Sequence, residues 1–152
     1  MEWCYFPMSH WVGLDYGTSR IGIAVADVNG GMALPLTTID ARGSSEADST
    51  AVLATCTEYE IHAFVVGLPY NMDGSEGPQA KLTRRFGEAL RKTSGHLVHF
   101  WDERLSSFAA EEALAERKLT RKRRRKSIDR IAAQGILQEF LAAQSNSEVP
   151  DA

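Results

Sequence analysis

Residues 11–27 read WVGLDYGTSRIGIAVAD, and this stretch predicts two strands joined by a tight turn. The first strand is expected from about Trp11 to Tyr16 and the second from about Arg20 to Asp27, with the turn at 17–19. In the second strand isoleucine and valine alternate with glycine and alanine, as on a pleated strand with one bulky face and one small face. The bulky face should pack into a core, and the small face should let a helix approach closely.

A third strand is expected directly after this pair. The sequence Asn-Gly-Gly at 29–31 is a strong hairpin signal, and residues 32–39 then have strand character. Pro35 within that strand indicates a sheet edge or a bulge, because proline cannot donate a hydrogen bond to a neighbouring strand. The chain should therefore begin with three antiparallel strands.

Helices and strands are expected to alternate after residue 40. Strands are predicted at 61–68 and 97–101. Helices are predicted after the polar 42–49 segment to about residue 60, from Pro78 past residue 90, from Ser106 or Ser107 to 119, and over 127–142. Three meandering strands followed by this alternation predict an α/β fold. Its mixed five-stranded sheet has three antiparallel strands and then parallel ones, with helices on both faces.

The composition is that of a globular protein with one domain. The chain has 152 residues, of which 43% are apolar and 24% charged. We assign residues 11–144 to the domain, residues 1–10 to an N-terminal extension and residues 145–152 to a flexible tail. No apolar stretch approaches the ~20 residues of a membrane helix, and the N-terminus lacks a basic leader, so we expect a cytoplasmic protein with no membrane partner.

The net charge of −3 conceals a separation between the two halves of the chain. Residues 1–80 carry ten Asp and Glu against two Arg, whereas residues 81–152 carry fifteen Lys and Arg against ten acids. The centre of the basic half is Arg-Lys-Arg-Arg-Arg-Lys at 121–126. Such a run favours a polyanionic partner, so we expect nucleic acid to contact it through Arg123, Arg124, Arg125 and Lys126. A solvated loop and a localisation signal are the alternatives.

Three acidic residues far apart in the chain have local patterns that favour a shared site. Asp15 and Glu103 each end an apolar run, and Asp129 opens an amphipathic helix just after the basic run. Carboxylate oxygens are the ligands that Mg²⁺ and Mn²⁺ prefer, and one such ion, or a pair, can promote hydrolysis of a phosphodiester. We therefore expect these three residues to be catalytic and to bind Mg²⁺ or Mn²⁺. For each residue alone, a helix cap or an ion pair is the structural alternative.

Weaker signals indicate contacts with the substrate. The turn residues Thr18 and Ser19 offer hydroxyl and backbone N–H groups to a phosphate, and Arg104 offers a bidentate guanidinium. Asn71 follows a buried strand, where loops often carry binding groups, although the Asp-Gly at 73–74 is also ordinary turn chemistry.

Four blocks of sequence, in order along most of the chain, resemble a known family. They are LDYGTSRIG at 14–22, VGLP at 66–69 with Asn71, Asp73 and Gly74, DERLS at 102–106, and Ile128-Asp129 with Ala132-Ala133 and Ile136-Leu137-Gln138. Together these blocks are similar to the signature blocks of the YqgF/RuvX family.

The resemblance implies an RNase-H-like fold, kinship with Holliday-junction resolvases, and a nuclease of 16S ribosomal RNA precursors that matures their 5′ end in ribosome biogenesis. Matched block by block, the family's acidic triad falls on Asp15, Glu103 and Asp129. The extension at 1–10 and the density of the basic run depart from the family's usual pattern.

Alternatives remain at this stage. The sequence at 15–19 also resembles the first phosphate loop of actin-like ATPases, but those enzymes need two lobes and a second loop, which 152 residues do not supply. A non-catalytic RNA-binding module for ribosome assembly and a DNA-junction nuclease both fit the basic run. The sequence does not distinguish an RNA substrate from a DNA substrate. It also leaves open whether the protein is a monomer or a homodimer.

Overall fold

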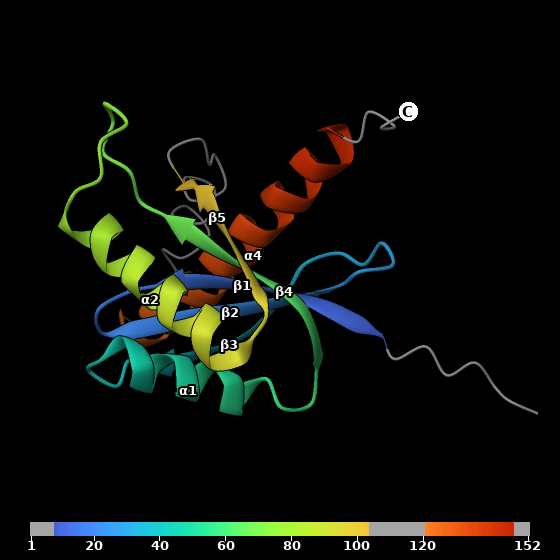
Figure 1. The fold of residues 1–152 in the computed structure, drawn as a ribbon, viewed down its shortest axis with the longest axis horizontal. Helices are drawn as coiled ribbons and strands as arrows, with labels where there is room; N and C mark the ends of the chain where they lie inside the picture. Colours follow the sequence, from blue (N-terminus) through green and yellow to red (C-terminus); the bar gives the residue numbers. More distant parts are fainter. Residues whose placement is uncertain (1–7, 104–120, 148–152) are drawn as a thin grey trace, which may run out of the picture.

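The computed structural model describes residues 8–103 and 121–147 and, within its last helix, the side chains of residues 128–144. The strands are β1 (Ser9–Tyr16), β2 (Arg20–Asp27), β3 (Leu34–Asp40), β4 (Glu60–Leu68) and β5 (Leu97–Asp102). The helices are α1 (Ser45–Thr55), α2 (Pro78–Ser94) and α4 (Arg121–Ser147). Figure 1 shows their arrangement.

The five strands form one mixed sheet in the order β3-β2-β1-β4-β5. β1 pairs antiparallel with β2, and β2 pairs antiparallel with β3. β1 and β5 both pair parallel with β4, so the carboxyl ends of β1, β4 and β5 reach the same edge of the sheet. This confirms the predicted fold class, including the change from antiparallel to parallel pairing.

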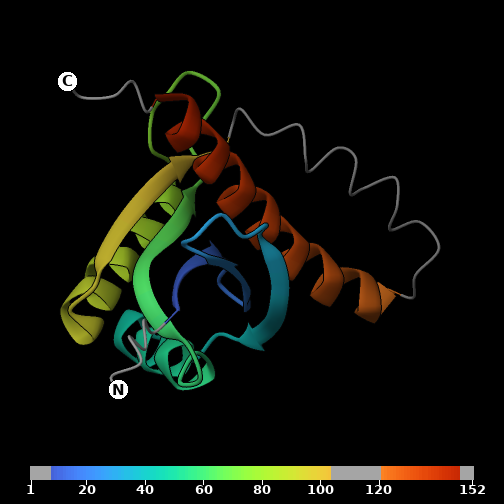
Figure 2. The same cartoon turned by 90° about the vertical axis from the view of Figure 1, so that its right-hand side faces the viewer.

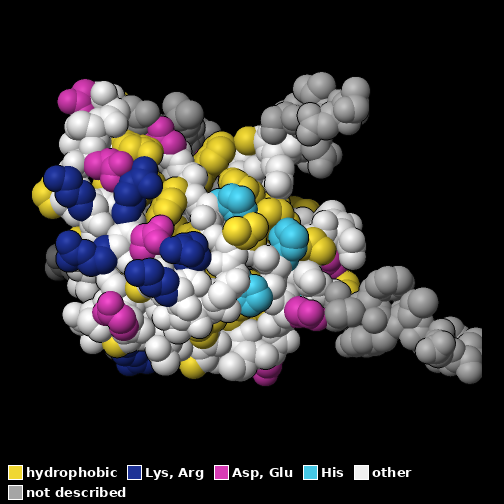
Figure 3. Space-filling model, in the orientation of Figure 1, with side chains coloured by type: hydrophobic (Ala, Val, Ile, Leu, Met, Phe, Trp, Pro, Cys, Tyr) yellow, Lys and Arg dark blue, Asp and Glu magenta, His cyan; other side chains and the backbone are white. Residues whose placement is uncertain are grey.

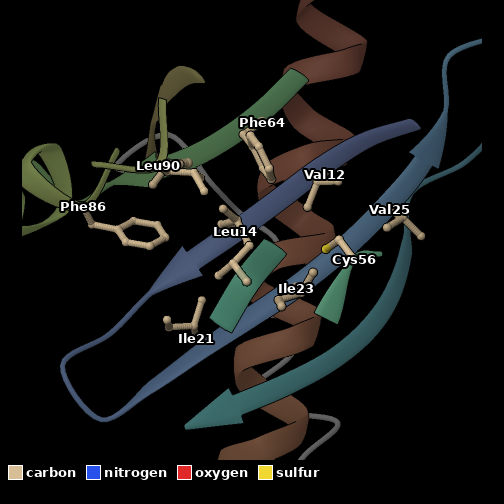
Figure 4. Close-up of a cluster of buried hydrophobic side chains, with 11 residues drawn as sticks. Val12, Leu14, Ile21, Ile23, Val25, Cys56, Phe64, Phe86 and Leu90 are labelled. Carbon is tan, nitrogen blue, oxygen red and sulfur yellow. The ribbon is translucent and has the colours of Figure 1, made fainter. Parts of the chain in front are cut away.

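Helices cover both faces of the sheet, as predicted (Figures 1 and 2). On one face α1 and α2 pack on the bulky side chains of the strands, with Leu14, Ile21 and Ile23 pointing toward the same layer as Phe86 and Leu90 (Figure 4). On the other face α4 crosses the sheet and packs on its small side chains. The molecule therefore has two apolar layers, separated by the sheet.

The predicted small face is the surface on which α4 lies. A Cβ atom built on Gly13 would lie 2.7 Å from Leu137 Cβ and 2.9 Å from the Ala133 carbonyl oxygen. A Cβ built on Gly22 would overlap the carbonyl group of Asp129. Side chains at these two positions would push the helix away, so the two glycines set how close α4 comes to β1 and β2.

Several element boundaries differ from those predicted. α4 begins at Arg121 and ends at Ser147, so the backbone of the basic run is helical and the helix continues into the predicted tail, as its many good helix formers allow. β1 begins at Ser9, inside the predicted extension. α1 begins at Ser45, inside the polar segment that was expected to precede it, because Ser44 caps the helix there, and it ends at Thr55. Pro35 does lie at an irregularity, because the β2–β3 register shifts between Ile23 and Ala24.

The helix predicted from Ser106 or Ser107 to 119 lies outside the described residues, as do residues 1–7 and 148–152. Among the helices that the structure describes, none combines the length and the apolar character needed to cross a membrane.

Candidate active site

Asp15 and Glu103 lie at the same edge of the sheet, on strands that do not pair with each other. Asp15 is near the end of β1 and Glu103 directly follows β5, with β4 between them. Gly67 of β4 explains how they meet, because a Cβ built on it would lie 2.5 Å from Glu103 Oε1. The missing side chain leaves room for the Glu103 carboxylate to lie over β4 and reach Asp15.

The two carboxyl groups are largely buried and interact directly. Burial, followed by the charges of Glu103 and Asp129, raises the pKa of Asp15 to about 8. Burial also raises the pKa of Glu103, the hydrogen bond with Asp15 acts in the opposite direction, and the charge of Asp102 adds to the increase. At neutral pH the Asp15 carboxyl is therefore protonated and donates its hydrogen bond to Glu103.

Asp129 is the third acid of the site, and it already has a partner. The Nε–H of Arg20 donates to Asp129 Oδ2 at 2.5 Å, and the two side chains are 29% and 17% exposed. Arg20 is the first residue of β2, so the pair joins the start of that strand to α4. Asp129 nevertheless lies close enough for its charge to act on Asp15. The structure thus brings all three predicted acids together, with Asp129 held toward β2.

The donor chemistry of the Asp15 and Glu103 pair fits a hard divalent cation. Two largely buried carboxyl groups lie side by side with raised pKa values, and their oxygens are the donors that Mg²⁺ or Mn²⁺ prefers. Within the described residues, however, no three Asp, Glu, His or Cys side chains form a group that is ready to hold a metal ion. Arg20 engages Oδ2 of Asp129, the acid that would complete the donor set.

Thr18 and Ser19 lie in the turn between β1 and β2, and both are exposed beside Arg20. The turn is closed by hydrogen bonds from Gly17 N–H to the Arg20 carbonyl at 2.9 Å and from Ala41 N–H to the Ser19 carbonyl at 2.9 Å. These bonds fix the backbone of the turn, and contact of the two side chains with phosphate stays a prediction.

Asn71 lies in the loop after β4 and organises that loop. Its backbone N–H donates to the Ser75 carbonyl at 2.8 Å, and its Nδ2 donates to Ser75 Oγ at 3.0 Å. These bonds show that Asn71 shapes the turn at 71–75. A role in substrate binding remains a prediction.

The remaining predicted contacts cannot be placed at the level of side chains. Arg104 lies outside the described residues. For Arg123, Arg124, Arg125 and Lys126 the structure describes the backbone, which forms the first turns of α4 shortly before Asp129. The basic run and the third acid are therefore carried by the same helix.

Sequence reasoning missed three features of this site. Arg20 was quoted within a matched block but was not singled out, although it is one of only two basic residues in positions 1–80. Gly67 gave no signal of its own, because its role depends on the strand order. The third feature is a group of exposed basic side chains on α2, at Lys81, Arg85, Arg91 and Lys92. Figure 3 shows Lys and Arg gathered over that helix.

α2 also begins beside the site. Gln79 Nε2 donates to the Tyr16 carbonyl at 3.2 Å, and the Tyr16 ring stacks on Phe86 with centroids 4.2 Å apart. These contacts fix the end of β1, and with it Asp15, against α2.

Comparison with known proteins decides the family. Residues 9–143 match the family model described as "RuvX: Holliday junction resolvase". The chain belongs to the RuvX family. A relative from Myxococcus xanthus, named "Putative pre-16S rRNA nuclease", is 48% identical over 132 residues, which cover 87% of each chain. A relative of the same name from Rhodobacter capsulatus is 50% identical over 129 residues, which cover 85% of this chain and 80% of that protein.

The fold of this RuvX chain is also that of a solved structure. The structure titled "T. thermophilus RuvC in complex with Holliday junction substrate" matches with a TM-score of 0.55 and 16% identity, covering 91% of this chain and 97% of that one. At this identity the match establishes the RNase-H-like fold alone. The family match and the fold both confirm the resemblance inferred from the four sequence blocks.

Proposed function

We propose that this protein is a metal-dependent nuclease that hydrolyses a phosphodiester bond in the precursor of 16S ribosomal RNA, at the 5′ end of the mature sequence. The observation that carries the proposal is the buried Asp15–Glu103 pair beside Asp129. It lies in a chain about half identical to relatives that bear the name of pre-16S rRNA nucleases. A buried pair of acids is costly to folding and is typical of sites that bind cations.

Asp15 and Glu103 would hold Mg²⁺ or Mn²⁺, and Asp129 would be the third ligand. When bound, the cation supplies Lewis acidity and neutralises charge at the phosphate. The residues of the chain prepare this site: the strand ends fix Asp15 and Glu103, and Gly67 leaves space between them. Asp15 must release its proton for both carboxylates to face a cation.

Nucleic acid would be held by positive charge near the acids. The proposed contacts are the basic run of α4, with Arg123, Arg124, Arg125 and Lys126, together with Arg104 and the polar side chains of Thr18, Ser19 and Asn71. The helical backbone of the run and its position shortly before Asp129 support this assignment. Such contacts position the phosphate backbone without reading its sequence. Because the proposed substrate is a ribosomal RNA precursor, we expect the protein to act in the cytoplasm.

Cleavage of a 5′-labelled precursor RNA tests the proposal. The wild-type protein should cut with Mg²⁺ or Mn²⁺ and stop when a chelator is added, whereas Asp15→Asn and Glu103→Gln should bind the RNA and leave it intact. Asp40→Asn is the matched control, because Asp40 is an exposed carboxylate at the end of β3. Undiminished cutting by Asp15→Asn, or cutting that is unaffected by the chelator, would overturn the proposal.

A DNA four-way junction is the second candidate substrate. It is favoured by the description of the family model, and carboxylate-bound cations promote hydrolysis of either polymer. A non-catalytic RNA-binding module is the third candidate, and RNA binding without any cleavage by the wild-type protein would favour it.

A further inference from the structure

Arg20 is the cation that the structure already places at the acidic site. Its guanidinium donates through Nε to Asp129 Oδ2 at 2.5 Å. Both side chains are mostly buried, at 29% and 17% exposure, so water weakens the pair less than it weakens a surface ion pair. The contact joins positions 109 residues apart, across the interface between β2 and α4.

The backbone of Asp129 has little freedom to move. The Asp129 carbonyl lies against the bare face of Gly22, two residues after Arg20 on β2. A change of partner at Asp129 must therefore come from rotation of its side chain. Arg20 contacts this carboxylate directly, and Asp15 is close enough for the charge of Asp129 to raise its pKa.

The described residues contain no ready-made cation site of three acids, although the three acids are neighbours. The ion pair with Arg20 engages Oδ2 of Asp129 and compensates its charge, so it opposes the use of this carboxylate as a cation ligand.

We propose that Arg20 is a positioning residue that competes with the divalent cation for Asp129. Without the cation, the guanidinium holds Asp129 toward β2 and compensates its charge. With a cation held by Asp15 and Glu103, the Asp129 carboxylate would turn from Arg20 and serve as the third ligand. This inference rests on the proposed cation site and adds an internal competitor to it.

Calorimetric titration of Mn²⁺ into chelator-treated protein tests the competition. Arg20→Ala removes the competitor, so the apparent Kd for Mn²⁺ should fall by about fivefold, as expected for loss of a partly buried ion pair. Arg130→Ala is the matched control: it removes the same charge one residue after Asp129, from an exposed side chain. It should change the Kd by less than about twofold, because an exposed charge is screened.

The Nε–H resonance of Arg20 in ¹H–¹⁵N spectra gives a second measurement, on the wild-type protein itself. Arg20→Gln assigns the resonance by its absence. Adding saturating Mg²⁺ should shift this resonance from the chemical shift of a hydrogen-bonded Nε–H to that of a free guanidinium. If the ion pair were purely structural, the chemical shift would not change.

The outcomes separate this inference from the proposed function. If the wild-type protein binds Mn²⁺ but Arg20→Ala leaves the Kd unchanged or raises it, and the Nε–H resonance stays in place, the competition is overturned while the cation site stands. If the wild-type protein binds no Mn²⁺, both the competition and the metal-dependent function are overturned.

Discussion

Replacing Asp15 with Asn should stabilise the protein in the absence of metal while abolishing cleavage. In the folded chain the pKa of Asp15 is raised from 3.8 to about 8, whereas in the unfolded chain the carboxyl ionises near its ordinary value. The unfolded chain therefore loses this proton first. Consequently, the contribution of Asp15 to the free energy of unfolding falls as the pH rises from about 4 to about 8, and is constant above that range.

The size of the effect follows from the same shift. At pH 7 the carboxyl is about 3 pH units above its ordinary pKa, and each unit corresponds to about 1.4 kcal/mol, so the upper bound is about 4 kcal/mol. Local relaxation and water entry reduce it. Asn is neutral in both states and keeps an N–H donor for Glu103, so we expect a gain of about 2 kcal/mol, or about 4–8 °C in Tm.

Thermal unfolding followed by circular dichroism, with a chelator present, measures this gain. Asp15→Asn should unfold at a higher temperature than the wild-type protein at pH 7, and the difference should shrink toward zero near pH 4. Asp40→Asn, at an exposed carboxylate, should change the stability by less than about 0.5 kcal/mol. With excess Mg²⁺ the wild-type protein should gain stability that Asp15→Asn does not, because only the native wild-type site binds the ion.

A Tm for Asp15→Asn that is equal to or below the wild-type value at pH 7 would refute the reasoning. So would a difference of the same size at pH 4 and pH 7, because the gain would then have nothing to do with the proton on Asp15.

Three further predictions concern the cation, the helix and the basic run. The affinity for Mn²⁺ should rise by up to about tenfold per pH unit from pH 6 to about 8 and then level off, since Asp15 must lose its proton; a flat profile by calorimetry would contradict this. Gly22→Ala should cost about 3 kcal/mol or more in urea unfolding, because the added methyl overlaps the Asp129 backbone; an unchanged midpoint would show that α4 moves freely. Replacing residues 123–125 with Ala should weaken RNA binding and reduce the slope of log K against log salt by about 2 to 3; an unchanged slope would place the run outside the binding surface.

The sheet could be predicted from sequence because its signals are local. The alternation of bulky and small residues over 20–27 predicted both a core face and a face for close helix packing, and Gly22 now lies against α4. The nearly continuous apolar stretch at 61–68 predicted a strand covered on both sides, which β4 is. Helix ends were less accurate, because the basic run was interpreted by its charge and not by its helix propensity.

The three acids could be singled out because Asp15 and Glu103 each end an apolar run and Asp129 was expected to open a helix, although α4 in fact begins at Arg121. What holds them together could not be predicted in the same way. The Arg20–Asp129 pair spans 109 residues, and the space that Gly67 leaves for Glu103 depends on β4 lying between β1 and β5. Both contacts arise from strand order and helix placement, which no local pattern encodes.

Cleavage of a labelled 16S rRNA precursor and of a four-way DNA junction, side by side under the same Mg²⁺ concentration, tests the central claim most directly. The account predicts that the wild-type protein cuts the RNA precursor faster than the junction, and that neither is cut with chelator or by Asp15→Asn. Cleavage of the junction alone would contradict the assigned substrate, and binding of both without cleavage would contradict the assignment as a nuclease.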